Sequence, residues 1–253
     1  MSFIPTHIAG ILPARWGSTR FPGKPLHRLA GKSLIEHVWL RCRECKALNS
    51  LLVATDDDRI RDEALSFGAE VVMTATHHLT GTDRIAEAVR SIPQATHIIN
   101  IQGDEPLIDP ALVDQLATAL ADDPALPMVT AANTISADDA YHDVNVVKVV
   151  LDRNGHALYF SRSPIPYLRH RPEGLEIYRH KGIYGYRRDF LESFVCWPPS
   201  LLEQAESLEQ LRALENGARI KVIITTDDSI GLDTPEQAGL IESLLLHQSS
   251  HNI

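Results

Sequence analysis

Short runs of β-branched and other apolar residues alternate with amphipathic helical stretches along most of this chain of 253 residues. The first apolar run covers residues 8–12, and from Ser33 onward apolar side chains recur at the spacing of a helix. The alternation continues, with strands expected at 51–54, 70–73, 97–101 and 128–132 and helices at 58–67, 80–90 and 110–121. Such βαβ repetition predicts an α/β fold with a doubly wound, mostly parallel sheet that helices cover on both faces.

The alternation changes at about residue 137. The next apolar runs have no expected helices between them and flank a segment rich in Pro and Arg; they lie at 146–151, 157–160 and 182–186. Strands that follow one another in this way commonly pair antiparallel, as a lid or a dimer surface. We therefore expect a single α/β domain over residues 1–253 that carries an inserted antiparallel β subdomain at about 137–190.

The βα pattern returns after this segment. The sequence Ser207-Leu-Glu-Gln210 predicts the capped start of a helix that ends at Asn216-Gly217. A strand is expected at 220–226. The last helix is expected to begin at Thr234-Pro-Glu-Gln237, which combines an N-cap residue, Pro at the first helical position and Gln at the third.

The charges of the chain are unevenly placed. It contains 24 Lys and Arg against 33 Asp and Glu, and the resulting net charge of −9 argues against a general nucleic-acid binder. No acidic residue precedes Glu36, whereas five basic residues do, namely Arg15, Arg20, Lys24, Arg28 and Lys32. A short basic stretch at the start of an acidic protein predicts a local site for an anion.

The cysteines and apolar runs bear on the compartment of the protein. Cys42, Cys45 and Cys196 cannot form a disulfide framework, and their odd number fits a reducing environment. The first residues lack the features of a signal peptide, and no apolar run approaches the ~18 residues that span a membrane. We therefore expect a soluble, cytoplasmic protein. The C-x-x-C pair Cys42 and Cys45 lies late in an expected helix without a second pair, so neither zinc nor a redox role is expected.

A loop rich in Gly, Pro and basic residues follows the first expected strand, where open α/β sheets bind their ligands. Its sequence is Pro13-Ala-Arg15-Trp-Gly17-Ser18-Thr-Arg20-Phe-Pro-Gly23-Lys24-Pro25. The glycines permit tight turns, and the backbone amides and Ser18 can donate hydrogen bonds to a phosphate that Arg15, Arg20 and Lys24 neutralise. The alternative is a solvated basic surface loop.

This loop matches neither of two common phosphate-binding motifs. A Walker A loop has four residues between its glycines and Ser or Thr after its Lys, whereas five residues separate Gly17 from Gly23 and a proline follows the lysine. Gly31-Lys-Ser33 has the right ending, but Leu26 occupies the place of the first glycine. No G-x-G-x-x-G follows the strand, so the dinucleotide fingerprint is absent as well.

Two carboxylates follow expected strands. Asp104 lies in Asn100-Ile-Gln-Gly-Asp-Glu-Pro106, and Asp233 separates a strand region from the start of the last helix. Mg²⁺ is typically held by one or two carboxylates together with phosphate oxygens. Alternatively, Asp104 is a turn residue and Asp233 only assists the helix cap. Taken with the basic loop, the two carboxylates favour chemistry on a nucleoside triphosphate.

Two further stretches contain basic but no acidic residues. Residues 153–172 include Arg162, Arg169, His170 and Arg171, and residues 177–188 include Arg179, His180, Lys181, Arg187 and Arg188. These side chains could bind the carboxylate of an acidic acceptor molecule. An exposed basic face is the alternative, favoured for Arg169, Arg171, Arg187 and Arg188.

Specific motifs occur in order along nearly the whole chain. They are Pro13-Ala-Arg15, Ser18-Thr-Arg-Phe-Pro-Gly-Lys24-Pro-Leu26, Gly81-Thr-Asp-Arg84, Gln102-Gly-Asp-Glu-Pro106, Phe160-Ser-Arg162, His180-Lys-Gly-Ile-Tyr184-Gly-Tyr186, Leu208-Glu-Gln-Leu211 and Asp233-Thr-Pro235. In this combination they resemble the 3-deoxy-manno-octulosonate (KDO) cytidylyltransferase family, also called CMP-KDO synthetases. Two residues depart from the family pattern, Trp16 in place of a smaller or tyrosyl residue and Gln237 in place of Asp. Both affect loop packing or helix capping more than chemistry.

The resemblance implies a nucleotidyltransferase-like fold and an enzyme that converts CTP and KDO to CMP-KDO and pyrophosphate, for lipopolysaccharide biosynthesis. The anomeric hydroxyl of the sugar would attack the α-phosphate of CTP in line. The residues implied in catalysis are Arg15 and Lys24, which would clamp the triphosphate, and Asp104 and Asp233, which would hold Mg²⁺. Those implied elsewhere are Gly81, Arg84 and Gln102 at the nucleotide, and Arg162, His180, Tyr184, Glu209 and Gln210 at the sugar acid.

The resemblance further implies a homodimer, with the inserted subdomain serving sugar binding and dimerisation. The acidic net charge and the lack of a long apolar run lead us to expect no nucleic-acid or membrane partner. Two alternatives remain open. A nucleotidyltransferase for another acceptor, such as a CMP-sialate synthetase or an alditol-phosphate cytidylyltransferase, is one, although Ile183-Tyr-Gly-Tyr186 favours the KDO family. The other is a non-catalytic sugar-nucleotide-binding module, against which Arg15, Lys24, Asp104 and Asp233 argue because such modules usually lose their metal ligands.

Overall fold

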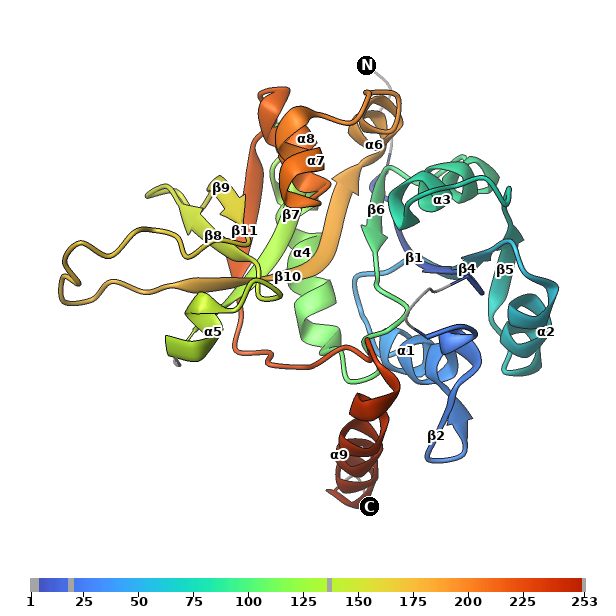
Figure 1. Cartoon of the computed structure of the whole chain (residues 1–253). Helices are drawn as coiled ribbons and strands as arrows, with labels where there is room; N and C mark the ends of the chain where they lie inside the picture. The colour runs from blue at the N-terminus through green and yellow to red at the C-terminus, as the bar shows by residue number, and fades with distance from the viewer. Residues whose placement is uncertain (1–4, 18–20, 136–137, 252–253) are drawn as a thin grey trace. The chain divides into compact units, whose positions relative to one another are not determined.

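A computed structural model of the chain describes residues 5–17, 21–135 and 138–251. Ser18 and Arg20, two of the expected phosphate-binding side chains, lie outside these residues. The chain divides into two compact units, of which the first comprises residues 1–114 and 228–253 and the second residues 115–227. Figure 1 labels the elements of both. The range expected for the inserted subdomain, about 137–190, lies within the second unit.

Four parallel strands form the sheet of the first unit. In spatial order they are β6 (His97–Asn100), β1 (Ile8–Ala14), β4 (Ser50–Thr55) and β5 (Glu70–Met73). Every neighbouring pair is parallel, and β1 is buried along nearly its whole length. A strand that has neighbours on both sides and helices above and below it must be apolar throughout, which explains its sequence IAGILPA. The parallel sheet expected from the βαβ rhythm is thereby confirmed.

Helices lie on both faces of this sheet. Figure 1 shows α3 (Gly81–Ala88) on one side and α1 (Leu34–Cys42) and α2 (Asp58–Ser66) on the other. The start of α3 is fixed by a capping box, because the backbone N–H of Asp83 donates to the Thr80 hydroxyl (3.0 Å) and that of Thr80 donates to the Asp83 carboxylate (3.3 Å). The expected helices are confirmed.

The C-terminal segment returns to the first unit. It contains the 3₁₀-helix η3 (Pro235–Gln237) and α9 (Ala238–His251), and the backbone N–H of Thr234 donates to the Gln237 side chain (3.0 Å) as the expected cap requires. Its apolar residues share one buried cluster with the N-terminal part of the unit, formed by Leu29, Leu34, Leu107, Leu232, Ile241 and Leu245. The smaller elements of this unit are η1 (Lys24–Leu26), β2 (Arg28–Leu29), β3 (Lys32–Ser33) and η2 (Val89–Ser91).

The second unit has a mixed sheet. Its strands are β7 (Met128–Thr134), β8 (Lys148–Leu151), β9 (Ala157–Ser161), β10 (Tyr178–Arg187) and β11 (Ile220–Ile224). β7 pairs parallel with β11 and antiparallel with β10, while β8 pairs antiparallel with both β9 and β10. The antiparallel strands expected in this part of the chain are confirmed. The helix α4 (Pro110–Asp122) contains the boundary between the two units.

One expected helix start in the second unit is wrong. Ser207 does not begin a helix; it ends α7 (Leu201–Glu206) in the left-handed conformation, with φ of 53°. The capping box belongs to Ser200 and Glu203, which open α7, and α8 (Gln210–Glu215) follows after Glu209. Two Ser-x-x-Glu/Gln sequences lie seven residues apart, so spacing alone does not show which one caps a helix. The short helices α5 (Asp138–His142), α6 (Arg188–Phe194) and α7 were not expected.

Candidate active site

A pocket of about 290 Å³ lies in the first unit, at the carboxyl ends of β1 and β6. It brings together all seven residues expected at the nucleotide and metal, namely Arg15, Lys24, Gly81, Arg84, Gln102, Asp104 and Asp233. The strands explain the convergence: Ile11 of β1 pairs with Asn100 of β6, so the loops that follow both strands start from one edge of the sheet. The pocket is also lined by Pro13, Ala14, Pro25, Leu79, Thr80 and Gly103, which the sequence motifs did not single out for chemistry.

Close backbone contacts hold the loops of the pocket together. A Cβ on Gly103 would lie 3.1 Å from the carbonyl oxygen of Pro13, so a glycine permits the β6 loop to approach the end of β1. The backbone N–H of Leu232 donates to the Asp104 carbonyl (2.8 Å). This bond places Asp233, the next residue, beside Asp104, although the two are far apart in the sequence.

Lys24 and the two carboxylates form the charged centre of the pocket. The Lys24 ammonium lies 2.6 Å from Oδ2 of Asp104 and 3.8 Å from Oδ1 of Asp233. Lys24 is held by its loop, because Gly23 adopts a left-handed φ of +71° and its N–H donates to the Trp16 carbonyl (3.1 Å). The lysine side chain is 16% exposed and the Asp233 side chain 50%, so the ion pair lies where the pocket opens to solvent.

These two carboxylates fit a magnesium site completed by a ligand. Both face a single positive charge, so their oxygens are able to converge on one cation. Within the described part of the chain, no group of three or more His, Cys, Asp or Glu side chains is arranged to hold a metal ion. Mg²⁺ is usually held by one or two carboxylates plus water and substrate phosphates, and this donor set is of that kind.

Two further arginines of the pocket differ in how firmly their side chains are held in place. Arg15 is exposed, and its Nη1 donates to the Leu79 carbonyl (3.3 Å). Arg84 is 2% exposed; its Nη2 lies 3.3 Å from Oδ1 of Asp56, and its Nη1 donates to the Thr74 hydroxyl. Arg84 is therefore a fixed part of the wall, whereas Arg15 is able to turn toward an incoming anion.

Gly81 lies where α3 begins, and its backbone forms part of the pocket wall. A Cβ at this position would lie 3.3 Å from Cγ of Pro13, so the glycine lets the helix start close to the end of β1. The first N–H groups of a helix have no intrahelical acceptor, and the helix dipole adds partial positive charge there. This wall therefore favours an anionic ligand.

The five residues expected at the sugar acid lie in the second unit. Among them, His180 and Tyr184 lie on β10, on either side of an irregularity in its pairing with β7 between Lys181 and Tyr184. Thr130 of β7 stabilises this bulge, since its hydroxyl lies 2.7 Å from the Ile183 carbonyl and 2.9 Å from Nε2 of His180. The hydroxyl has one proton and donates it to the carbonyl, so it accepts from the imidazole Nε2–H, which leaves Nδ1 as an acceptor.

Burial sets the charge state of this pair. It lowers the pKa of His180 to about 3 and raises that of Tyr184 well above its ordinary value, with Tyr186 and the Glu209 carboxylate adding to the shift of Tyr184. Both side chains are therefore neutral at pH 7. The rings lie 5.4 Å apart, and each keeps part of its surface accessible to solvent.

Glu209, Gln210 and Arg162 present different groups. Gln210 is 3% exposed, and its Nε2 has no hydrogen-bond partner among the described residues. A buried amide without a partner costs about 1–3 kcal/mol, which a bound ligand could recover. The guanidinium of Arg162 donates to the carbonyls of Glu206 (2.8 Å), Val144 (3.1 Å) and Ser207 (3.5 Å). A ligand at Arg162 would use its remaining N–H groups.

Other basic residues of the second unit have structural partners. Lys181 is 5% exposed, and its Nζ lies 2.8 Å from Oδ2 of Asp227, so the suggestion that it binds an acceptor carboxylate does not fit. Arg169 and Arg171 are exposed, as expected for a basic face. Arg187 and Arg188 are half-buried and form ion pairs with Asp189 (2.6 Å) and Glu192 (2.9 Å).

The parallel sheet and its charged pocket are those of a nucleotidyltransferase, and residues 9–220 match the family model described as cytidylyltransferase. The chain is 48% identical over 246 residues to 3-deoxy-manno-octulosonate cytidylyltransferase of Syntrophotalea carbinolica, covering 94% of this chain and 98% of the relative. It is 49% identical over 239 residues to the enzyme of that name from Geobacter sulfurreducens, covering 90% and 95%. The chain therefore belongs to the 3-deoxy-manno-octulosonate cytidylyltransferase family, as its motifs indicated.

A solved structure agrees with this assignment. A CMP:2-keto-3-deoxy-manno-octonic acid synthetase complexed with CTP is similar to the chain, with a TM-score of 0.91 and 41% sequence identity. The similarity covers 96% of this chain and 100% of that structure's chain. The fold class expected from the sequence, a mostly parallel nucleotidyltransferase-like sheet with flanking helices, is confirmed.

Proposed function

We propose that this protein is a cytidylyltransferase that converts CTP and KDO to CMP-KDO and pyrophosphate. The family membership and the activity for which the relatives are named support this proposal. The strongest structural support is the pocket in which Lys24 faces both Asp104 and Asp233 beside Arg15. Cations and paired carboxylates at the end of a parallel sheet suit the transfer of a nucleotidyl group, which depends on positioning and charge stabilisation.

In the proposed reaction, the anomeric hydroxyl of KDO attacks the α-phosphorus of CTP. The new bond joins that oxygen to the α-phosphorus while the hydroxyl proton passes to solvent. The bond from the α-phosphorus to the oxygen that bridges it to the β-phosphorus breaks, and pyrophosphate leaves with the electron pair. Arg15 and Lys24 bind the triphosphate and stabilise the charge that develops on the leaving group. Asp104 and Asp233 would hold Mg²⁺, which supplies charge neutralisation and a template for the phosphate oxygens. Arg84, Gln102 and the backbone at Gly81 form the wall that positions the nucleotide.

The second unit is proposed to bind the sugar acid. The Gln210 amide donates to the ligand, which provides the acceptor that its Nε2 lacks. Nδ1 of His180 and the Glu209 carboxylate accept hydrogen bonds from sugar hydroxyls, and the neutral Tyr184 phenol donates one. Arg162 offers its remaining N–H groups to the substrate carboxylate. A polyhydroxylated acid offers hydroxyl groups, which donate and accept hydrogen bonds, and one carboxylate. These groups match the protein side chains named above.

A single set of assays tests the proposal. Pyrophosphate release is measured with CTP or UTP and with KDO, N-acetylneuraminate or an alditol phosphate as acceptor. We expect turnover with CTP and KDO and little with any other pair. Equal or better turnover with N-acetylneuraminate or the alditol phosphate would reassign the acceptor. CTP binding without turnover of any acceptor would indicate a non-catalytic binding module.

The metal site needs its own test. Asp104→Asn should lower kcat with saturating Mg²⁺ by at least about 100-fold, since one carboxylate ligand is lost, while Tm changes little because Asp104 is partly exposed. Asp62→Asn, on the exposed face of α2, is the matched control. A near-normal kcat in Asp104→Asn contradicts the metal role.

We also propose that the protein forms a homodimer through the antiparallel strands of the second unit. Its proposed location is the cytoplasm, and its proposed role is in lipopolysaccharide synthesis. Light scattering after gel filtration would measure the mass against that of one 28.1 kDa chain. A mass of one chain at micromolar concentration contradicts the dimer. Among the described residues, no helix is both long and apolar enough to cross a bilayer.

A further inference from the structure

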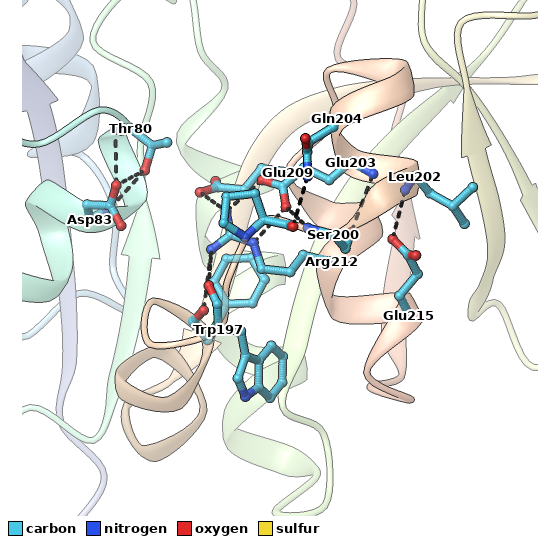
Figure 2. Close-up of polar contacts among 12 residues, drawn as sticks. Thr80, Asp83, Trp197, Ser200, Leu202, Glu203, Gln204, Glu209, Arg212 and Glu215 are labelled. Atoms are coloured by element: carbon cyan, nitrogen blue, oxygen red, sulfur yellow. Dashed lines mark hydrogen bonds and ion pairs between the residues drawn. The ribbon is translucent and has the colours of Figure 1, made fainter.

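Arg212 of α8 is a buried cation that joins three segments of the second unit. It is 5% exposed, and its Nε and Nη2 donate to the two carboxylate oxygens of Glu203 on α7, at 2.8 and 2.6 Å (Figure 2). Its Nη1 also donates to the carbonyls of Phe194 (3.4 Å) and Trp197 (3.3 Å). The bidentate pair with Glu203 fixes the plane of the guanidinium, so its positive charge has one defined place.

A second carboxylate lies against this charge. Oε1 of Glu209 is 3.5 Å from Nη2 of Arg212, one helical turn along the chain (Figure 2). Glu209 is the N-cap residue of α8, yet its side chain makes no capping hydrogen bond. The side chain is therefore not turned toward the amides of its own helix, and the charge of Arg212 helps to set its direction. Because Glu209 also contributes to the raised pKa of Tyr184, its charge acts on the expected sugar-acid cluster.

The two carboxylates are held differently by the one guanidinium. Glu203 is 13% exposed and makes short, paired hydrogen bonds, whereas Glu209 is 25% exposed and is attracted over a longer distance. At 3.5 Å the contact attracts Glu209 and offsets part of its desolvation cost. The Glu209 side chain is 25% exposed, so a ligand is able to reach it.

We propose that Arg212, fixed by Glu203, is a positioning residue that holds the Glu209 carboxylate in place to accept hydroxyl groups of the sugar acid. The inference rests on the proposed function, in which Glu209 contacts that substrate. Arg212 does not touch the substrate and acts through Glu209. A lysine in its place keeps the charge but loses the planar fork that spans both carboxylates.

A purely structural role for Arg212 makes different predictions. In that case its loss lowers Tm and the yield of folded enzyme, but leaves the KM of either substrate unchanged in the molecules that fold. A positioning role changes the KM for KDO and not that for CTP, because the nucleotide pocket is built from other residues. The two roles are therefore separated by kinetics and not by stability.

The experiment compares Arg212→Lys, Glu203→Gln, Glu209→Gln and the double variant Arg212→Lys with Glu209→Gln, using pyrophosphate release from CTP and KDO. We expect Arg212→Lys and Glu209→Gln each to raise the KM for KDO about tenfold. The KM for CTP should stay within about twofold of the value for the unaltered enzyme. The double variant should match Glu209→Gln alone, since Arg212 acts through Glu209. Val222→Ala, a buried apolar change in β11, should lower Tm and leave both KM values unchanged.

Three outcomes decide the matter. Arg212→Lys with a lower Tm and an unchanged KM for KDO overturns the proposal, as do effects of Arg212→Lys and Glu209→Gln that multiply in the double variant. If Arg212→Lys does not fold, Glu203→Gln keeps the arginine and should raise the KM for KDO severalfold; an unchanged value overturns the proposal as well. Absence of turnover in the unaltered enzyme refutes the proposed function instead, so the two failures are distinguishable.

Discussion

The ammonium of Lys24 lies 2.6 Å from one carboxylate oxygen of Asp104 and 3.8 Å from one of Asp233. Lys24 therefore compensates the charge of both carboxylates when the pocket holds no ligand. The same ammonium is proposed to bind the triphosphate, and the same carboxylates are proposed to bind Mg²⁺. Nucleotide and metal binding should consequently favour each other. A triphosphate that binds the Lys24 ammonium draws this positive charge away from the carboxylates, which then attract the metal cation more strongly.

Replacing Lys24 should strengthen metal binding in the absence of nucleotide. Lys24→Met removes a positive charge next to both carboxylates, so the affinity for Mn²⁺, a spectroscopic substitute for Mg²⁺, should rise about tenfold. Electron paramagnetic resonance of free Mn²⁺ measures this directly. The control is Lys32→Met, which changes an exposed lysine of β3. Unchanged Mn²⁺ affinity in Lys24→Met would show that the ion pair does not compete with the metal.

The half-buried imidazole of His180 should make the protein sensitive to acid. The unfolded chain takes up a proton there below about pH 6.5, whereas burial lowers the pKa of the folded state to about 3. The unfolded state thus binds more protons, and the free energy of unfolding falls as the pH drops from 6.5 toward 3. His180→Gln keeps a donor near the Thr130 hydroxyl but does not titrate.

Urea unfolding at several pH values tests this expectation. Between pH 6.5 and 5 the unaltered protein should lose about 2 kcal/mol more stability than His180→Gln. His142→Gln, an exposed position at the end of α5, should lose stability in parallel with the unaltered protein. Parallel loss in His180→Gln would mean that this imidazole is not the source of the acid sensitivity.

Gln210 should show a conflict between stability and binding. Its buried Nε2 lacks a protein partner, so Gln210→Met, which has a similar shape and no amide, should keep or raise Tm. The same change should raise the KM for KDO about tenfold, because a hydrogen bond to the ligand is lost. Gln204→Met removes an amide that donates to the Pro199 carbonyl on the exposed face of α7 and serves as the control. A marked drop in Tm for Gln210→Met would show that the amide has a structural role.

Gly103 should tolerate no side chain. The Cβ of Gly103→Ala would lie 3.1 Å from the Pro13 carbonyl oxygen, and backbone on both sides must move to accept it. We expect a loss of about 1–3 kcal/mol in unfolding free energy together with a lower kcat/KM for CTP, since the loop that carries Asp104 shifts. Gly239→Ala meets no atom within 4 Å at the start of α9 and should be neutral or slightly stabilising. Thermal unfolding and steady-state kinetics compare the two variants.

Local patterns predicted the elements of the first unit well. The strand at Glu70–Met73 and the helix that follows Thr80 were expected close to where they occur, because β-branched runs and helical periodicity leave a signal within a few residues. The second unit was harder. Ser207 resembles a helix start but takes the left-handed conformation that ends α7, since the preceding box at Ser200 already begins a helix.

The residues of the candidate site were also only partly predictable from local sequence patterns. Strand-end positions pointed to Lys24, Asp104 and Asp233, because parallel strands bring their carboxyl ends to one edge. The contact between His180 and Thr130 joins strands that are far apart in the chain, and that between Arg212 and Glu203 joins two consecutive helices, α7 and α8, through side chains nine residues apart. Such contacts depend on register and tertiary packing, so a single sequence carries no periodic signal for them.

The return of the chain to the first unit has a consequence for its synthesis. A ribosome delivers Lys24 and Asp104 before the second unit, and Asp233 only after the entire second unit has been synthesised. Before that moment the nascent chain lacks one of the two carboxylates that are proposed to bind the metal, and it lacks the core residues Ile241 and Leu245, which follow Asp233. Products of premature termination in the second unit therefore lack Asp233 and are unable to complete the pocket.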